Sequence, residues 1–182
     1  ATEPNGMSIL HFRKSFQLAS KPEHFIIHIS ADNRYRLFVN GQPVAFGPAR
    51  SDLRHWNFET IDIGTQLKTG VNTLAAVVWN FGNLNPQAQM SYRTGFIAQG
   101  NKKTESIINT GSEWKVFKNE SYKPLIPVLP NYIDVGPGEY VDGEKYPWDW
   151  ERTDFDDSHW VNAQNICKGR PKGKWSGPEW DL

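Results

Sequence analysis

The chain has 182 residues, and its 20 lysines and arginines balance 20 aspartates and glutamates, so its formal net charge is zero. This balance argues against a protein that binds the phosphate backbone of nucleic acids. The absence of a run of about 18 apolar residues argues against a membrane-spanning helix. The single cysteine, Cys167, excludes an internal disulfide framework and a zinc site built from several cysteines.

The elements in chain order are mostly short strands. Residues 1–8 are polar and show no signal-peptide pattern, so we expect a disordered N-terminal segment. Alternating apolar and polar residues then predict strands at 11–18, 24–30, 34–39, 42–46, 56–63, 71–79, 93–99 and 114–118. Asn40-Gly41 predicts a hairpin turn, because both residues tolerate positive φ. The 71–79 strand is apolar on both faces from Leu74 onward, which is typical of a strand covered on both sides.

Helical patterns are sparse, and only 64–68 and 156–160 suggest single turns. Strands separated by turn residues at roughly ten-residue spacing predict an all-β domain, an antiparallel β-sandwich or jelly roll, over 9–166. Within it, the Pro- and Gly-rich stretch at about 122–150 predicts a long surface excursion. Residues 167–182 have the composition of a linker but contain two tryptophans, so we expect this segment to pack on a neighbouring part of the protein.

Most catalytic and metal-binding patterns are missing. There is no Gly-x-Ser-x-Gly turn, and Cys167 has the character of an incidental thiol in a tail. His24 and His28 share one face of a predicted strand but lie about 13 Å apart, too far for one ion. The carboxylates after residue 138 are dense, but a glycosidase needs two of them about 5–10 Å apart in a cleft. We therefore predict no catalytic and no metal residue.

Two acidic turns offer oxygens to calcium. Asp32-Asn33 lies in a predicted turn, and Asp154, Asp156 and Asp157 form a cluster. Neither follows the spacing of an EF-hand loop, so capping of the turns is the favoured interpretation and structural calcium the alternative.

The loop after the predicted hairpin combines residue types that bind sugars. Arg50, Asp52 and Arg54 offer planar hydrogen bonding to vicinal hydroxyls, and Trp56 offers an apolar face for a sugar ring. Trp79 and Asn83, after the central strand, have similar character. These six residues form the predicted carbohydrate site. The alternative is an internal Arg–Asp brace that holds the loop to its neighbours.

Several stretches together resemble one family. They are FRKSF (12–16), the segment 29–63, LKTGVNTLAAVVWNFG (67–82), TGSEWKVFKN (110–119), GPGEYVDG (136–143), WDWERTDFDDSHWVNA (148–163) and GPEWDL (177–182). Together they resemble the N-terminal β-sandwich region of bacterial α-L-rhamnosidases of glycoside hydrolase family 78 and its relatives. The resemblance implies a galactose-binding-domain-like sandwich. Tyr35, Asn40 and Gly41 also occur in sugar-binding sandwich domains of other glycosidases.

The resemblance implies a non-catalytic domain. The family's catalytic residues lie on an (α/α)6 barrel, whose helical pattern this chain lacks, and Glu139 in the Gly-Glu motif is expected to be structural or interdomain. Expected partners are a downstream catalytic domain of the same protein and carbohydrate, including rhamnose-containing glycans. Rhamnose-binding modules of this family use calcium, but no residue here matches that site. Such enzymes are commonly exported, so the resemblance implies a periplasmic or extracellular location.

Three functional hypotheses follow. The first is an accessory domain of an α-L-rhamnosidase-like glycoside hydrolase that supports the catalytic domain. The second is a free-standing lectin-like module, and the third is a small independent glycosidase. Five of the eight tryptophans follow residue 147, which points to an interdomain surface rather than a sugar platform.

Overall fold

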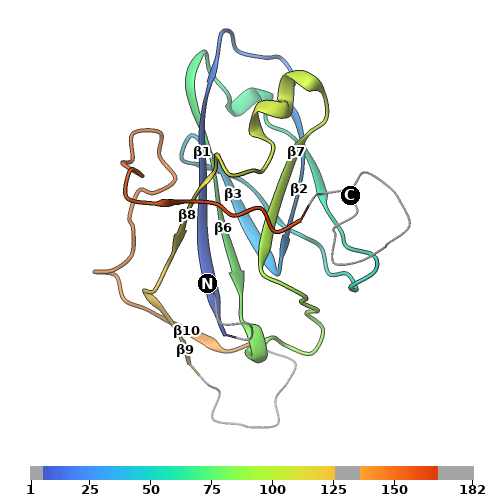
Figure 1. Ribbon diagram of the computed structural model, residues 1–182, viewed down its shortest axis with the longest axis vertical. Coiled ribbons are helices and arrows are strands. Elements are labelled where there is room, and N and C mark those ends of the chain that lie inside the picture. The colour runs from blue at the N-terminus through green and yellow to red at the C-terminus, as the bar shows by residue number, and fades with distance from the viewer. Residues whose placement is uncertain (1–5, 126–135, 168–182) are drawn as a thin grey trace.

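The computed structural model describes residues 6–125 and 136–167, which fold into antiparallel β-sheets (Figure 1). The strands are β1 (Ser8–Leu18), β2 (Ile26–Asp32), β3 (Arg34–Val39), β4 (Gln42–Gly47), β5 (Glu59–Asp62), β6 (Gly70–Asn80), β7 (Gly95–Gly100), β8 (Lys115–Lys118), β9 (Tyr122–Leu125), β10 (Gly138–Val141) and β11 (Val161–Asn162). Three 3-10 turns accompany them: η1 (Gly64–Gln66), η2 (Gly82–Leu84) and η3 (Lys103–Ile108). The predicted all-β sandwich is confirmed.

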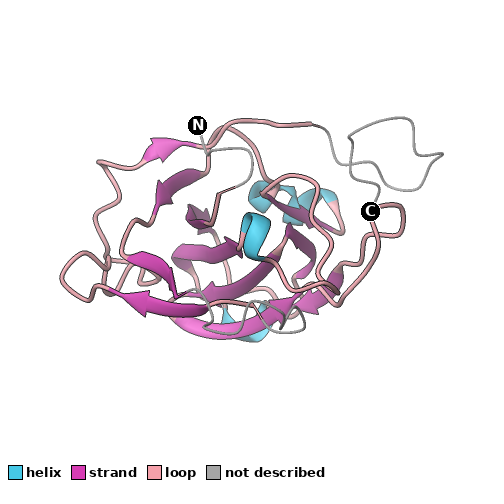
Figure 2. Cartoon of the chain, turned by 90° about the horizontal axis from the view of Figure 1, so that it is seen from below, coloured by secondary structure: helices cyan, strands magenta, loops and turns pink. Residues whose placement is uncertain are grey.

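Two sheets face each other across the core (Figure 2). One has six strands in the order β11-β8-β1-β6-β3-β4, and the other has three in the order β5-β2-β7. In the longest pairing, β1 and β6 run antiparallel from Ser8↔Asn80 to Leu18↔Gly70. A separate two-stranded sheet joins β9 and β10. No helix in the described ranges is long and apolar enough to cross a membrane.

The main core follows from the alternation within the strands. Tyr35, Leu37 and Val39 of β3 are fully buried in it, whereas the residues between them face the other side of the sheet. Burial of each aliphatic side chain contributes about 1.5–3 kcal/mol. The predicted hairpin is present, with φ of 52° at Asn40 and 83° at Gly41. This turn aligns β3 with β4 and thereby places the start of the following loop.

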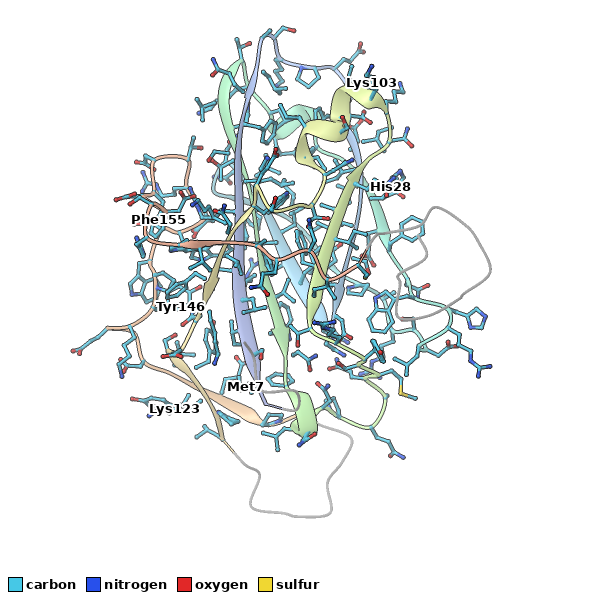
Figure 3. All side chains as sticks on the ribbon, viewed as in Figure 1. Met7, His28, Lys103, Lys123, Tyr146 and Phe155 are labelled. Atoms are coloured by element: carbon cyan, nitrogen blue, oxygen red, sulfur yellow. The ribbon has the colours of Figure 1, made fainter. Side chains whose placement is uncertain are left out.

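The other face of the six-stranded sheet is also covered. Trp150 and Trp160, which are 2% and 3% exposed, form a second buried cluster with Ala75 of β6. Tyr146 and Phe155 belong to the same cluster, and Figure 3 shows both on the side of β1 opposite His28 of β2. The prediction that β6 is covered on both faces is therefore confirmed. The later part of the chain forms a covering layer.

Several predicted boundaries shift. β1 begins at Ser8, the last residue of the predicted disordered segment, and β5 is shorter than the predicted 56–63 strand because Asp52 and His55 close a tight turn before it. Residues 156–160 form a single hydrogen-bonded turn rather than a helical one. Its hydrogen bond runs from Trp160 N to Asp157 O at 3.0 Å. The predicted linker lies almost entirely outside the described residues, as does most of segment 1–8.

Several elements had no sequence prediction. The excursion at 122–150 contains the β9–β10 pair, β11 follows it, and η2 and η3 form after β6 and β7. Glu105 of η3 is 4% exposed, and its carboxylate accepts hydrogen bonds from Lys102 N at 2.6 Å and Ile26 N at 3.0 Å. A 3-10 turn is too short to show a periodic apolar pattern in the sequence. The hydrogen bond between Glu105 and Ile26 of β2, which fixes η3, appears only in the folded structure.

Candidate functional site

A pocket of about 280 Å³ opens where the β3–β4 hairpin meets the loop that follows it. Its lining consists of Arg34, Phe46, Gly47, Pro48, Ala49, Arg50 and Glu59. A second hollow of about 20 Å³ shares four of these residues and extends to Ser51, Trp56 and the loop residues Ala88, Gln89 and Met90. The site therefore combines the first residue of β3, the end of β4, the start of β5 and two loops.

Among the described residues, Glu59 is the one carboxylate in the pocket lining, and both of its oxygens accept protein hydrogen bonds. Tyr35 Oη donates to Oε2 at 2.8 Å, and Ala49 N donates to Oε1 at 2.9 Å. Burial, followed by the contact with Glu59, raises the pKa of Tyr35, so its hydroxyl stays protonated as a donor. Gly47 permits this packing, because a Cβ there would lie 2.3 Å from Glu59 Oε2.

Two guanidinium groups line the same pocket without a carboxylate partner. With the Gln89 amide oriented to satisfy its neighbours, its oxygen accepts from Arg34 Nε at 2.6 Å and Nη2 at 2.8 Å, and its nitrogen donates to Asn33 Oδ1 at 3.1 Å. Within the described part of the chain, the guanidinium of Arg50 has no hydrogen-bond or ion-pair partner. Arg34 is thus held in position and Arg50 is free to meet a ligand.

An aromatic ring stands at the edge of the pocket. Phe46 lies on the edge strand β4, and 79% of its surface is exposed. An exposed aromatic face next to fixed polar groups suits a ring with one apolar and one polar side. Hydrogen-bond donors, one acceptor and an apolar face are the chemistry that a saccharide requires.

The structure brings only two of the six predicted sugar-site residues to this place, Arg50 and Trp56. Asp52 instead caps its own turn, accepting from Arg54 N at 2.7 Å and His55 N at 2.9 Å. The hydrogen bond from the His55 side chain is the main cause that lowers the pKa of Asp52. Arg54 is exposed and lines neither hollow. Among the described residues, Asp52 makes no ion pair with an arginine, so the alternative Arg–Asp brace is wrong.

The other two predicted residues lie elsewhere. Trp79 is a half-buried residue of β6, paired in register with Arg34 and Ile9, and Asn83 is exposed in η2. Neither lines the pocket. Sequence reasoning missed Arg34, Phe46 and Glu59. The one local signal for Phe46 was its position at the end of the predicted 42–46 strand, next to the loop that carries Arg50.

The acidic residues considered for calcium have protein partners. Asp32 is fully buried and accepts hydrogen bonds from Ser91 Oγ, Tyr92 N and Arg93 N, each at 2.7 Å, which ties the loop before β7 beside the pocket. Asp157 pairs with Arg13 at 2.8 Å. Across residues 6–125 and 136–167, no three His, Cys, Asp or Glu side chains group together as metal ligands would. The described residues give the calcium hypothesis no support.

Glu139 is not part of the pocket. It lies on β10, opposite Pro124 of β9. Partial burial raises its pKa. This position in the separate two-stranded sheet agrees with a structural role and places Glu139 outside the pocket that contains Glu59.

Comparison with known proteins gives the fold a family. A model of the alpha-L-rhamnosidase N-terminal domain matches residues 20–175. The structure of a GH78 rhamnosidase from Bacillus sp. GL1 superposes with a TM-score of 0.78 and 31% identity, covering 90% of this chain and 17% of that one. An α-L-rhamnosidase from Dictyoglomus thermophilum gives a TM-score of 0.63 and 22% identity, with coverages of 85% and 17%. No curated protein matches the chain.

A lectin shares the same fold. The lectin of Pleurotus ostreatus superposes with a TM-score of 0.51 and 19% identity, covering 88% of this chain and 36% of the lectin. The molecule is thus a β-sandwich domain of a type found both in rhamnosidases and in a lectin. The chain belongs to the family of α-L-rhamnosidase N-terminal domains. It spans about a sixth of the length of the bacterial rhamnosidases named above, 17% of each.

Proposed function

We propose that this chain is a non-catalytic accessory domain of an α-L-rhamnosidase-type glycoside hydrolase. We further propose that it contacts saccharide through the pocket of about 280 Å³ beside the β3–β4 hairpin. The observation that carries the proposal is the combination of Phe46, two arginines and one fixed carboxylate around a single pocket. A lectin of the same fold supports a role in saccharide contact. The family supports rhamnose-containing glycans as ligands and a catalytic domain of the same protein as partner.

Binding without cleavage is the chemistry that this pocket supports. Hydrolysis of a glycosidic bond needs a second carboxyl, about 5–10 Å from the first, to act as acid, base or nucleophile. Of the residues that the structure describes, Glu59 is the single carboxylate in the lining, and Tyr35 and Ala49 donate to its two oxygens. It is therefore suited to accepting hydrogen bonds from sugar hydroxyls in a fixed orientation.

The absence of catalysis is tested with the purified chain and an aryl α-L-rhamnoside. We expect no release of the aryl group above the rate without protein. Turnover that disappears in the Glu139→Gln variant would contradict the proposal, because it would make Glu139 a catalytic residue.

Saccharide contact is tested on a glycan array and by titration of the glycans that bind. Loss of the stacking face in Phe46→Ala should weaken binding about tenfold. Phe58→Ala is the matched control, because Phe58 is an exposed aromatic (40%) that packs on His28 and does not line the pocket. Equal weakening by both variants would argue against the pocket, and no binding at millimolar glycan would leave a purely structural role.

A further inference from the structure

We infer that the pocket selects a saccharide that carries an anionic group, such as the carboxylate of a uronic acid or a sulfate ester. The inference rests on the proposed saccharide contact and adds the charge of the ligand. It starts from an imbalance in the described lining, which contains two guanidinium groups and a single carboxylate.

The carboxylate does not neutralise both arginines. One carboxylate stands against two guanidinium groups, and Glu59 accepts from the hydroxyl of Tyr35 and the backbone N–H of Ala49 rather than from either arginine. Gln89, the partner of Arg34, is a neutral amide. Among the described residues, neither Arg34 nor Arg50 has a carboxylate within ion-pair distance. The positive charge of both side chains is therefore available to a ligand.

The arrangement suits recognition of an anion that presents two or more oxygens. Gln89 accepts from Nε and Nη2 of Arg34, which sets the orientation of the guanidinium and leaves Nη1 without a partner in the described chain. Arg50 is exposed in the neighbouring loop, and its guanidinium has no partner within residues 6–125 and 136–167. Charge-assisted hydrogen bonds from arginine to carboxylate or sulfate are about twice as strong as neutral ones. One arginine is thus pre-oriented, and the second can close on the same group.

The dimensions fit one sugar unit. The pocket of about 280 Å³ lies just below the range of about 300–1,000 Å³ that is typical of small-molecule sites. Phe46 stands at its rim with 79% of its surface exposed. A pyranose ring can pack on this aromatic face while a substituent on its C6 side reaches the arginines. A uronic acid carries its carboxylate at that position.

The test compares sugars that differ only in this charge. The wild-type chain is titrated calorimetrically with glucuronate and glucose, with galacturonate and galactose, and with rhamnose. Glucose 6-sulfate separates a sulfate ester from a carboxylate, and inorganic sulfate reports simple anion binding. We expect the preferred acidic sugar to bind about tenfold more tightly than its neutral counterpart and to weaken with added salt.

Variants locate the effect. Arg50→Gln and Arg34→Gln should each weaken binding of the acidic sugar about tenfold and weaken binding of the neutral sugar less, so the preference for the acidic sugar falls. Arg54→Gln is the matched control, because Arg54 lies in the same loop, is exposed and does not line the pocket. Arg50→Gln removes an exposed side chain, so it tests the inference even if Arg34→Gln perturbs the fold.

Each contrary outcome has a separate meaning. Equal binding of acidic and neutral sugars, lost in Phe46→Ala, would overturn the charge selection and leave the proposed saccharide contact standing. Inorganic sulfate that binds as tightly as the acidic sugars, or equal loss in Arg54→Gln, would reduce the effect to non-specific attraction of anions and overturn the inference. No binding of any of these sugars at millimolar concentration would overturn both proposals.

Discussion

A single arginine holds the covering layer to the six-stranded sheet. Arg13 of β1 is 1% exposed and forms an ion pair with Asp157 at 2.8 Å. Its guanidinium also donates to three backbone carbonyl oxygens of that layer, those of Trp150, Arg152 (3.0 Å) and Phe155 (3.4 Å). A buried cation is tolerated only when its donors are used, and here one side chain serves four acceptors.

Removing this side chain should therefore be costly. Arg13→Ala leaves Asp157 and the three carbonyls without their shared donor, and we expect the free energy of unfolding to fall by about 3–5 kcal/mol. Arg13→Lys should recover only part of this, because an ammonium cannot reproduce the planar fork of donors. Urea denaturation measures both changes.

The control is a surface ion pair. Lys118 and Glu120 lie 3.9 Å apart with 49% and 79% of their side chains exposed, so Lys118→Ala should cost less than about 1 kcal/mol. An Arg13→Ala variant as stable as Lys118→Ala would show that the covering layer is held by other contacts.

At the scale of the element, the segment after β10 acts as a third layer. Trp150 packs edge-on against Phe38 of β3 and His11 of β1, with ring centroids 5.4 Å and 4.2 Å apart. Trp160 stacks on Phe117 of β8, with ring centroids 5.3 Å apart. These three strands are thereby covered on their outer face. The late tryptophans of the described chain thus divide into two that serve this layer and one, Trp148, that is 67% exposed.

Two tryptophans in this segment provide a matched comparison. Trp150→Ala removes a buried ring from the second core and should lower the free energy of unfolding by about 3–5 kcal/mol. Trp148→Ala changes a mostly exposed ring and should cost about 0.5 kcal/mol or less. Chemical denaturation followed by circular dichroism gives both values. Similar losses in the two variants would contradict the assignment of Trp150 to a core.

At the scale of the whole molecule, stability depends on pH through a buried histidine. His11 is fully buried, and the rings of Phe117, Tyr146 and Trp150 surround it. Its Nε2 accepts a hydrogen bond from Asn119 Nδ2 at 2.9 Å. Burial lowers the pKa of His11 from 6.5 to about 3, because none of these neighbours carries a charge that would stabilise the imidazolium.

The sign of the effect follows from this lowered pKa. The unfolded chain takes up the proton near pH 6.5, whereas the folded chain resists it until about pH 3, so stability is complete above pH 6.5 and falls as the pH decreases. Between pH 6.5 and 4.5 we expect a loss of about 2 kcal/mol. Asp62, whose pKa is lowered to about 2 mainly by the Phe25 N–H, loses its contribution only below this range.

Urea denaturation at several pH values between 6.5 and 4.5 measures this loss. The His11→Gln variant, whatever its stability at pH 7, should lack that slope. His24 acts in the opposite direction, because the hydrogen bond with Asp62 raises its pKa and its contribution is lost as pH rises. His24→Gln is therefore the control. A wild-type profile as flat as that of His11→Gln would contradict the role of His11.

Much of the architecture was predictable because it depends on local patterns. Tyr35, Leu37 and Val39 alternate with a second set of residues that includes two arginines, and Asn40-Gly41 allows the positive φ that the hairpin needs, so β3 and β4 could be located before any contact was known. The absence of long apolar repeats at helical spacing indicated an all-β domain. The loss of alternation from Leu74 onward also marked β6 as covered on two faces, although it did not show which residues form the second cover.

The pocket was predictable only in part, for a physical reason. Arg50 and Trp56 stand in a loop whose composition is unusual, and this local signal was enough to select them. Asp52 carries the same signal, but the backbone N–H groups of its own turn use its carboxylate. A sequence shows which groups can form hydrogen bonds and not which partner reaches them first.

By itself, then, the sequence determined most of the strands and the hairpin, because side-chain alternation and turn residues act over a few neighbouring positions. The family followed from the resemblance of several stretches to rhamnosidase N-terminal regions. Only the tertiary structure decided the site. Tyr35 meets Glu59 across 24 positions, and Arg13 reaches Asp157 across 144. Such pairs form when separate strands and loops are brought together by burial of the two cores, so their polar chemistry is a consequence of packing.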